Sequence, residues 1–559
     1  QAVEHVSAGS VSDPVTKEYT EDTMKDGFIR VAAATPDIHV ADPQYNSEQI
    51  IELMEQGSTR GVKVMAFPEL CLTAYTCSDL FLQESLLREA KKELKRILQA
   101  SKSKDMILFV GMPWMHKGKL YNVAAVLNRG RILGIVPKKH LPNYSEFYEL
   151  RHFNPGMEKV EMTDWEGVQV PMGMNLLFAC RTMPELVLAA ELCEDVWVPC
   201  PPSISHALAG ATVIANCSAS DETTGKDQYR YNLICGQSAR LVCGYIYANA
   251  GEGESSQDLV FGGQNIIAEN GTCLVQSDRF KNACICADLD LGRIISERRR
   301  MTTFRDEENR SASYETVYFE LNTEDSAKKD SKKAGQKRDE LLRYIDPAPF
   351  VPHDAGQRER RCEEILSIQA MGLKKRLAHT NCKHAVIGLS GGLDSTLALL
   401  VTVRAFDMLQ IPRENIHCIT MPCFGTTDRT YTNACTMAKK TGASLTEINI
   451  RDAVTGHFKD INHDIEKHDV TYENGQARER TQILMDIANE VGGMVIGTGD
   501  MSELALGWAT YNGDHMSMYG VNASVPKTLV RHLVRYYADT CGEKELSDVL
   551  LDVLDTPVS

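Results

Sequence analysis

The stretch from residue 385 to 406 constrains the fold most. It reads AVIGLSGGLDSTLALLVTVRAF, where a short apolar run passes without a spacer into Ser390, Gly391 and Gly392 and then into a long apolar segment. This order predicts a buried strand, a tight glycine turn and the start of a helix. The free N–H groups at a helix start favour an anion such as pyrophosphate, and Asp394 in the same turn indicates an intervening hard cation such as Mg2+. A plain Ser/Gly turn with Asp394 as an N-cap is the structural alternative.

The chain is long enough for two domains, because 559 residues exceed what one hydrophobic core usually supports. After a polar lead-in over residues 1–27, short apolar runs alternate with helical or loop segments, and an amphipathic helix is expected over 79–100. The runs lie at 29–34, 62–67, 106–111, 132–137, 186–193, 212–217 and 244–250. Two stacked sheets flanked by helices, an α-β-β-α sandwich, fit this pattern over residues 28–322.

The second half predicts a different α/β domain. Residues 323–340 are almost wholly charged and small, so we expect a linker over 323–360. From 361 to 559, apolar runs at 385–389, 416–422, 445–450 and 493–499 are separated by helical stretches. This alternation predicts a doubly wound parallel sheet, which binds ligands beyond the carboxyl ends of its strands.

Charge and cysteine usage narrow the class of protein. The net charge of −16 speaks against nucleic-acid binding, which needs clustered Lys and Arg. The 17 cysteines form no CxxC pair and their odd number cannot all be paired, which indicates reduced thiols in the cytoplasm. No apolar run has the length of a membrane span. We therefore expect a cytoplasmic protein that acts on small molecules.

Three residues in the first half suit amide hydrolysis. Glu69 in FPELCLTAY, Lys138 in VPKKHLPNYSEFYE and Cys193 in AAELCEDVW each close an apolar run, which predicts a place at a strand end. Cys193 would be the nucleophile, Glu69 the base that takes the thiol proton, and Lys138 the cation beside the oxyanion. Only one of the adjacent Lys138 and Lys139 can point inward from a strand end. The structural alternative for Cys193 is one more buried cysteine.

Both halves resemble known families. SGGLDS resembles the pyrophosphate loop of the N-type ATP pyrophosphatases. Together with ENGQARERTQIL at 473–484, GTGDMSELALGWATYNGD at 497–514 and VNASVPKTL at 521–529, it looks like the glutamine-dependent NAD synthetases. The patches around Glu69, Lys138 and Cys193 are similar to the carbon–nitrogen hydrolase, or nitrilase, family. In glutamine-dependent NAD synthetases that domain acts as the glutaminase. In the pattern of the nitrilase family the lysine follows the proline directly, which implies Lys138 and not Lys139.

The resemblance implies glutamine, ATP and deamido-NAD as substrates, Mg2+ as the metal, and a homo-oligomer, often an octamer. It implies a glutamine pocket with Tyr144, Glu194 and Ser220, deamido-NAD contacts from Arg478 and Asp514, Mg2+ ligands Asp394 and Glu503, and ATP contacts from Gly388, Ser390, Gly391, Gly392, Asp394, Ser395, Thr498 and Lys527. Lys226 stands where the family often has Arg. Ammonia released at Cys193 would cross to the second domain by a dry passage. Family members continue beyond DTPVS, so the synthetase domain is expected to be incomplete at its C-terminus.

Other classes remain open at this point. Another glutamine amidotransferase could be built on the same ATP loop. An asparagine synthetase needs an N-terminal catalytic Cys, whereas this chain starts with Gln1, and a GMP synthetase has its Cys in a Gly-flanked turn, whereas Cys193 lies between Leu192 and Glu194. A non-catalytic homologue, or a hydrolase fused to an idle nucleotide-binding module, would lack one or both activities.

Overall fold

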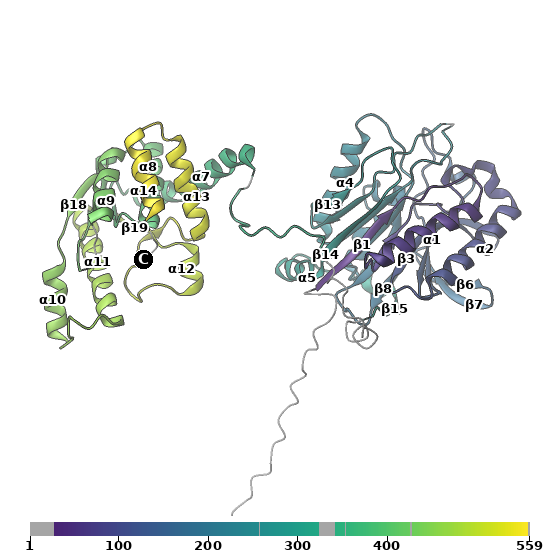
Figure 1. The fold of residues 1–559 in the computed structure, drawn as a ribbon, viewed down its shortest axis with the longest axis horizontal. Helices are drawn as coiled ribbons and strands as arrows, with labels where there is room; N and C mark the ends of the chain where they lie inside the picture. Colours follow the sequence, from purple (N-terminus) through teal and green to yellow (C-terminus); the bar gives the residue numbers. More distant parts are fainter. Residues whose placement is uncertain (1–26, 257, 323–340, 353, 425–427, 557–559) are drawn as a thin grey trace, which may run out of the picture. The chain divides into compact units, whose positions relative to one another are not determined.

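The computed structural model describes residues 27–256, 258–322, 341–352, 354–424 and 428–556. Residues 1–26 of the expected lead-in and residues 323–340 of the expected linker lie outside these ranges. The chain divides into two compact units, Gln1–Tyr344 and Ile345–Ser559, each with its own sheets (Figure 1). No helix in the described ranges is long and apolar enough to cross a membrane.

The first unit contains two sheets packed face to face. The eight-stranded sheet has the order β14 (Cys284–Asp290), β1 (Phe28–Ala34), β2 (Val64–Ala66), β3 (Ile107–His116), β4 (Lys119–Asn128), β5 (Arg131–Pro137), β7 (Val168–Met172) and β6 (Glu161–Trp165). The seven-stranded sheet has the order β13 (Thr272–Gln276), β12 (Ile266–Glu269), β11 (Gly244–Asn249), β10 (Val213–Ser218), β9 (Val187–Leu192), β8 (Leu176–Cys180) and β15 (Glu315–Phe319).

Alternation along the strands divides the first unit into layers. On β10, Ala215 faces the core between the sheets, whereas Ile214 faces the outer helices. The inner core also holds Phe109 and Phe178, whose ring centroids lie 6.3 Å apart. Helices α1 (Pro43–Thr59) and α2 (Glu84–Ser101) cover the first sheet (Figure 1). Helices α3 (Pro202–Leu208) and α4 (Lys226–Leu241) cover the second. The predicted α-β-β-α sandwich is confirmed.

One predicted helix begins later than its pattern suggests. The structure starts α2 at Glu84, and residues Tyr75–Leu82 form the short 3-10 segment η2 instead. Ser78 has a positive φ of 50°, which interrupts a right-handed helix, and Gln83 is extended. Asp79 accepts hydrogen bonds from Arg151, so this stretch packs against another segment as a loop and does not extend the helix.

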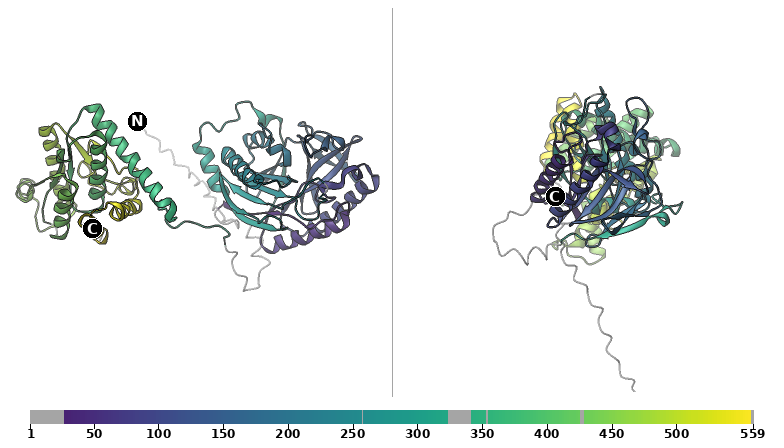
Figure 2. Two further views of the ribbon diagram at one scale, coloured as in Figure 1. Left: turned by 90° about the horizontal axis from the view of Figure 1, so that it is seen from above. Right: turned by 90° about the vertical axis from the view of Figure 1, so that its right-hand side faces the viewer.

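The second unit is a doubly wound parallel sheet, as predicted. Its strand order is β18 (Ser444–Glu447), β17 (Ile416–Thr420), β16 (Ala385–Gly388), β19 (Met494–Gly497) and β20 (Tyr519–Gly520), with every neighbouring pair parallel. One face packs against α7 (Ala355–Thr380), α8 (Leu393–Leu409), α9 (Asp428–Thr441), α13 (Lys527–Thr540) and α14 (Lys544–Asp555). The other face packs against α10 (Arg451–Asp460) and α11 (Val470–Val491). Figure 2 shows α7 as the longest helix of this unit.

The direction of winding changes between β16 and β19. From β16 the chain goes outward to β17 and β18 and then returns to β19 on the opposite side of β16. Such a switch leaves an opening beyond the carboxyl ends of the two strands. The segments that follow them are 389–392 and 498–500, which carry the predicted ATP loop and the TGD stretch.

Candidate active sites

The first candidate site lies where three strands of the sandwich end. Glu69 follows β2, Lys138 directly follows β5, and Cys193 directly follows β9, so residues far apart in sequence meet at one edge of the two sheets. The ammonium nitrogen of Lys138 lies 2.6 Å from Glu69 Oε1, and neither side chain is exposed. Asn122 Nδ2 donates to the same Glu69 oxygen at 2.6 Å, and the backbone N–H of Ala219 donates to Oε2 at 3.1 Å. The structure therefore brings the three predicted residues together.

Glu149 is a fourth member of this cluster that sequence reasoning missed. Its Oε1 accepts hydrogen bonds from Lys138 Nζ at 2.7 Å and from the Tyr75 hydroxyl at 2.8 Å. Burial, together with the charge of Glu69, raises the pKa of Glu149 to about 7, although Lys138 acts in the opposite direction. Burial disfavours the Lys138 ammonium, but the two carboxylates raise its pKa well above the usual value, so it stays protonated. The signal was present in YSEFYE, since Glu149 lies in the patch that carries Lys138.

Cys193 occupies a strained turn at the start of η4 (Cys193–Val196). Its φ is +38°, in the left-handed region that residues with side chains avoid. Its backbone N–H donates to Asn216 Oδ1 at 3.1 Å. Burial and the negative charge of Glu69 raise the pKa of the Cys193 thiol, whereas Lys138 and a hydrogen bond with Ser218 lower it. The thiol is therefore protonated in the resting site, and a base must take its proton as it attacks.

Asp195 fixes the nucleophile's turn against the loop that carries Lys138. This buried carboxylate accepts from the backbone N–H of Leu192 at 3.1 Å, and from the backbone N–H groups of Lys139 and His140 at 3.4 and 2.9 Å. Lys139 itself points to the surface, where its ammonium lies 2.6 Å from Glu158. Only Lys138 of the pair reaches the cluster.

The predicted glutamine pocket is brought together in part. The Tyr144 hydroxyl donates to Glu194 Oε1 at 2.9 Å, beside the nucleophile. Ser220 is buried, and its hydroxyl accepts from Arg230 Nη2 at 3.2 Å, so that oxygen already has a partner. Lys226 forms an ion pair with Asp221 and lies 5.5 Å from the Trp197 ring centroid. Its ammonium also lies 5.9 Å from the ring centroid of Phe147, which packs against Tyr144, so this cation lies near the Tyr144–Glu194 pair.

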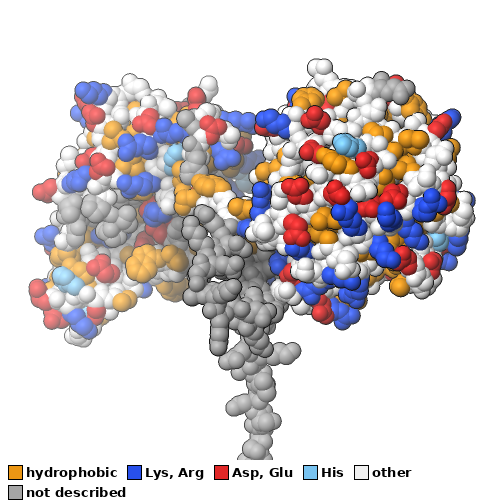
Figure 3. Space-filling view, turned by 45° about the vertical axis from the view of Figure 1, so that its right-hand side comes forward, with side chains coloured by type: hydrophobic (Ala, Val, Ile, Leu, Met, Phe, Trp, Pro, Cys, Tyr) orange, Lys and Arg blue, Asp and Glu red, His pale blue; other side chains and the backbone are white. Residues whose placement is uncertain are grey.

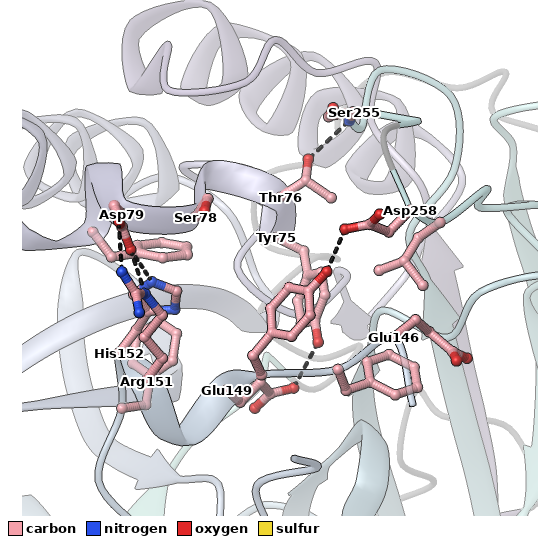
Figure 4. Close-up of a pocket in the computed structure, with 15 residues that line it drawn as sticks. Tyr75, Thr76, Ser78, Asp79, Glu146, Glu149, Arg151, His152, Ser255 and Asp258 are labelled. Carbon is pink, nitrogen blue, oxygen red and sulfur yellow. Dashed lines mark hydrogen bonds and ion pairs between the residues drawn. The ribbon is translucent and has the colours of Figure 1, made fainter. Parts of the chain in front are cut away.

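A cavity of about 350 Å³ is lined by Glu149 but not by the other members of the cluster. Tyr75 and Glu149 link it to the cluster, while Cys193, Glu69 and Lys138 do not line it. Figure 4 shows the Tyr75–Glu149 hydrogen bond on the cavity wall and, away from it, Asp79 bonded to Arg151. The Cys193 thiol is therefore not part of the wall of this cavity.

The second candidate site lies at the switch point of the parallel sheet. Gly391 has a φ of +78°, and a Cβ there would lie 2.0 Å from the carbonyl oxygen of Thr430. Only glycine fits this turn. Ser390 Oγ accepts from the backbone N–H of Gly392 at 3.2 Å and lies 3.1 Å from Ser395 Oγ, so the loop is closed by its own hydroxyls. Gly388 lies earlier, in β16, where a Cβ would approach Leu484 to 3.0 Å.

Three carboxylates surround one ammonium beside this loop. Lys527 Nζ lies 2.6 Å from Asp394 Oδ2, 2.9 Å from Asp500 Oδ2 and 3.1 Å from Glu503 Oε1. One oxygen from each acid lies within 4.8 Å of the others, a spacing suited to one cation. Burial raises the pKa of Asp394, although Lys527 lowers it. Asp500 was not predicted, although it lies in the GTGDMSE stretch.

The remaining predicted residues lie around this group. Asn522, also missed, is buried and donates from Nδ2 to the carbonyl oxygens of Asp394 and Thr498, both at 3.0 Å. Arg478 on α11 donates to the carbonyl oxygen of Tyr511 at 3.2 Å. Asp514 closes the same loop by accepting from the backbone N–H of Thr510 at 2.8 Å. Arg478 and Asp514 thus reach one loop, without contacting each other directly.

These two sites are typical of one class of protein, a thiol amide hydrolase joined to a nucleotide-binding enzyme with a glycine turn. Residues 30–299 match the carbon-nitrogen hydrolase family model, and residues 365–544 match the NAD synthase family model. The chain is 42% identical over 545 residues to the glutamine-dependent NAD(+) synthetase of Mycobacterium leprae, covering 95% of this chain and 78% of that protein. It is 29% identical over 514 residues to the Aquifex aeolicus glutamine-dependent NAD(+) synthetase, covering 91% and 81%.

Among solved structures, a glutamine-dependent NAD(+) synthetase from Cytophaga hutchinsonii aligns over 95% of this chain and 84% of its own, with 23% identity and a TM-score of 0.43. On the extent and identity of the sequence matches, this chain belongs to the family of glutamine-dependent NAD(+) synthetases, which are ligases.

Proposed function

We propose that Cys193 releases ammonia from glutamine and that the second unit uses it to convert deamido-NAD to NAD at the expense of ATP. The observation that carries the first half is the buried group of Glu69, Lys138 and Glu149 beside the strained Cys193 turn. Tyr144 and Glu194 would hold the glutamine at the entrance.

Hydrolysis follows from the charges in this group. Glu69 takes the Cys193 proton as the sulfur attacks the glutamine amide carbon, and the developing oxyanion lies near the Lys138 ammonium. The tetrahedral species collapses to a thioester, and the proton returns to the departing ammonia. Water then cleaves the thioester to glutamate with Glu69 as the base. Glu149 keeps the Lys138 ammonium in place through its 2.7 Å hydrogen bond.

The second unit fits an ATP pyrophosphatase. The glycine turn at Gly391 and the start of α8 suit a pyrophosphate, with Ser390, Gly392 and Ser395 beside it. ATP would activate the carboxylate of deamido-NAD as an adenylate, with pyrophosphate leaving, and ammonia would displace AMP. Arg478 on α11 and Asp514 both make hydrogen bonds to the loop that we assign to deamido-NAD. Thr498 follows the end of β19, where we place ATP.

The acidic group fits a hard divalent cation. Asp394 Oδ1 is buried without a hydrogen-bond partner, an oxygen that a metal ion could satisfy. Asp394, Asp500 and Glu503 would hold Mg2+, which would neutralise charge on the phosphates when bound. Lys527 would then be free to contact a phosphate oxygen.

Domain bounds, oligomeric state and localisation are part of the same proposal. We assign glutamine hydrolysis to residues 28–322 and NAD formation to residues 361–559, with a linker over residues 323–360. The exposed apolar side chains of Leu506, Trp508 and Tyr511 favour a homo-oligomer, because contact with a second copy would remove their surface from water. Light scattering measures the mass in solution and so tests whether the chain forms an oligomer, such as an octamer.

We also propose that the protein lies in the cytoplasm, which agrees with its free cysteines.

One experiment tests the proposed function directly. The chain is incubated with deamido-NAD, ATP and Mg2+, and NAD formation is compared with glutamine and with ammonium chloride as nitrogen source. NAD should form from either source, with stoichiometric pyrophosphate release. NAD formation from ammonium but not from glutamine would contradict glutamine hydrolysis by the first unit. Glutamate release without NAD formation would contradict NAD formation by the second unit.

A further inference from the structure

A row of buried polar side chains leads from the backbone of the nucleophile across the seven-stranded sheet. The Cys193 N–H donates to Asn216 Oδ1 at 3.1 Å, and Asn216 Nδ2 donates to the Tyr245 hydroxyl at 3.1 Å. Tyr245 in turn donates to Glu191 Oε1. The second oxygen of Glu191 accepts from the backbone N–H of Ser203 at 2.9 Å. We call Asn216, Tyr245 and Glu191 the buried relay; none of them is more than 1% exposed.

Strand register explains why these residues meet. Glu191 on β9 and Asn216 on β10 are direct partners, and Tyr245 lies on β11, the next strand of the same sheet. Side chains on the same face of these strands, such as Ala189 on β9 and Ile214 on β10, belong to the apolar core under α3 and α4. A carboxyl group in this apolar layer is costly to bury, so an aliphatic residue would be favoured unless its hydrogen bonds to Tyr245 and Ser203 had a use.

The donors and acceptors of the relay allow one direction. Because the Cys193 N–H faces the Asn216 amide oxygen, the amide nitrogen must face Tyr245. The phenol oxygen accepts there, so its own hydrogen must go onward, and it meets an acceptor, the Glu191 carboxylate. The relay therefore orients the Asn216 amide through the Glu191 carboxyl group at its far end, whose pKa burial raises to about 7. Among the described residues, no side-chain atom of the relay is left buried and unpaired.

The Cys193 turn needs such an anchor. Its φ of +38° is a conformation that the surrounding structure must impose on a residue with a side chain. The thiol must also point toward Glu69 and Lys138, whose charges both act on it. The hydrogen bond that the Cys193 N–H donates to Asn216 Oδ1 fixes the nitrogen next to the Cys193 Cα, and thereby the direction of the side chain.

We propose that Glu191, acting through Tyr245 and Asn216, is a positioning residue that holds the Cys193 turn in its strained form and aims the thiol at Glu69 and Lys138. The proposal rests on glutamine hydrolysis at Cys193 and extends it to residues that do not touch the substrate.

The variant Tyr245→Phe tests the relay, because it removes one oxygen and leaves Asn216 Nδ2 and Glu191 Oε1 without partners. The kcat for glutamine hydrolysis should fall about 10- to 100-fold, the size expected when a reacting group is displaced by about 1 Å. The KM should stay within about twofold, since Tyr144 and Glu194 are unchanged. Alkylation of Cys193 by iodoacetamide, followed by mass spectrometry of its peptide, should slow in parallel. The exposed Cys200 provides the reference rate in the same sample.

Tyr314→Phe is the matched control. It also removes a phenol hydrogen bond in the first unit, the 2.7 Å contact with His206 Nδ1, but it lies outside the relay. Its kcat should stay near that of the unchanged chain. Ammonium-driven NAD formation should be unaffected in both variants, which shows that the second unit is intact.

Glu191→Gln provides a second variant should Tyr245→Phe not fold. It preserves volume but replaces one acceptor by a donor, so either Ser203 or Tyr245 loses its partner, and the kcat should again fall without a matching change in KM. Unchanged kcat and alkylation in a folded variant would overturn the relay. If the unchanged chain itself hydrolysed no glutamine, the proposed function would be wrong, while the alkylation comparison would still decide whether the relay positions the thiol.

Discussion

The ammonium of Lys138 lies between the carboxylates of Glu69 and Glu149, 2.6 Å from one and 2.7 Å from the other, in a part of the first unit that water does not reach. This cation therefore does two things. It supplies positive charge beside the thiol, and it compensates buried negative charge. Removing it affects both stability and activity.

Replacement of Lys138 by Met should destabilise the first unit by about 3–5 kcal/mol, because two carboxylates would be left buried without a cation. Lys139→Met is the control, since its partner Glu158 is exposed and surface pairs contribute about 0–1 kcal/mol. Urea unfolding monitored by tryptophan fluorescence measures both, because Trp114, Trp165 and Trp197 lie in this unit. Equal losses in the two variants would contradict the assignment of the buried cation.

Replacement of Cys193 by Ala should abolish glutamine-driven NAD formation, by on the order of 10⁴-fold or more, since the nucleophile is gone. Formation from ammonium should continue at the unchanged rate. Cys200→Ala removes an exposed thiol and should leave both activities intact. If the Cys193 variant lost both activities together, the division of the reaction between two sites would be wrong.

Replacement of Asp394 by Asn should reduce NAD formation from either nitrogen source by about 10²- to 10³-fold, because it weakens the group that faces the phosphates. Glutamine hydrolysis should persist. Asp407→Asn, on the same helix but paired with Arg413 at the surface, is the control. Pyrophosphate release and calorimetric Mg2+ binding are the measurements. Undiminished Mg2+ binding would remove Asp394 from the metal site.

Replacement of Gly391 by Ala should abolish ATP binding, because the new methyl would lie 2.0 Å from the Thr430 carbonyl oxygen in a backbone conformation that alanine avoids. At Gly456, inside α10, a Cβ has no neighbour within 4 Å. Gly456→Ala should therefore stabilise the second unit by up to about 1 kcal/mol with normal ATP binding. Thermal shift with and without ATP separates the outcomes, and tight ATP binding by the Gly391 variant would exclude the turn as the phosphate site.

His206 should make the first unit acid-sensitive. Burial lowers the pKa of this side chain to about 4, below its usual value of 6.5. The folded state therefore disfavours protonation: the stability is present above pH 6.5 and is lost as the pH falls toward 4, by up to about 3 kcal/mol. His206→Gln should unfold with a smaller difference between pH 7.5 and pH 4.5. An identical pH dependence in both proteins would contradict a buried neutral histidine.

Some parts of this fold follow directly from sequence. The runs at β1, β9, β10 and β16 are mostly apolar because most side chains of these strands are buried, and turn residues bound them. Glu69, Lys138 and Cys193 were found because each ends such a run. Glu149 does not end an apolar run, and its position in the cluster depends on a hydrogen bond from Tyr75, which is far away in the sequence. The periodicity of apolar residues does not predict such long-range contacts.

The same limit applies to Asp500 and to the buried relay. Asp500 caps α12 (Met501–Leu506) by accepting from the Glu503 N–H at 2.9 Å, so from sequence it reads as a helix cap. Glu191 stands inside an apolar run, where its polarity was a signal, yet its partners come from two other strands. The start of α2 was placed too early because a positive φ at Ser78 leaves no mark on the apolar pattern.

The group around Lys527 has a formal charge that can be summed. Three carboxylates contribute −3 and one ammonium +1, which leaves −2 when all are ionised. One alkaline-earth ion carries the opposite charge, so it can enter without leaving excess charge in the fold. Because burial raises the pKa of Asp394, a falling pH protonates this carboxylate and removes part of the attraction. The proposed metal should therefore bind less tightly as the pH falls, and without it the Lys527 ammonium compensates part of the negative charge.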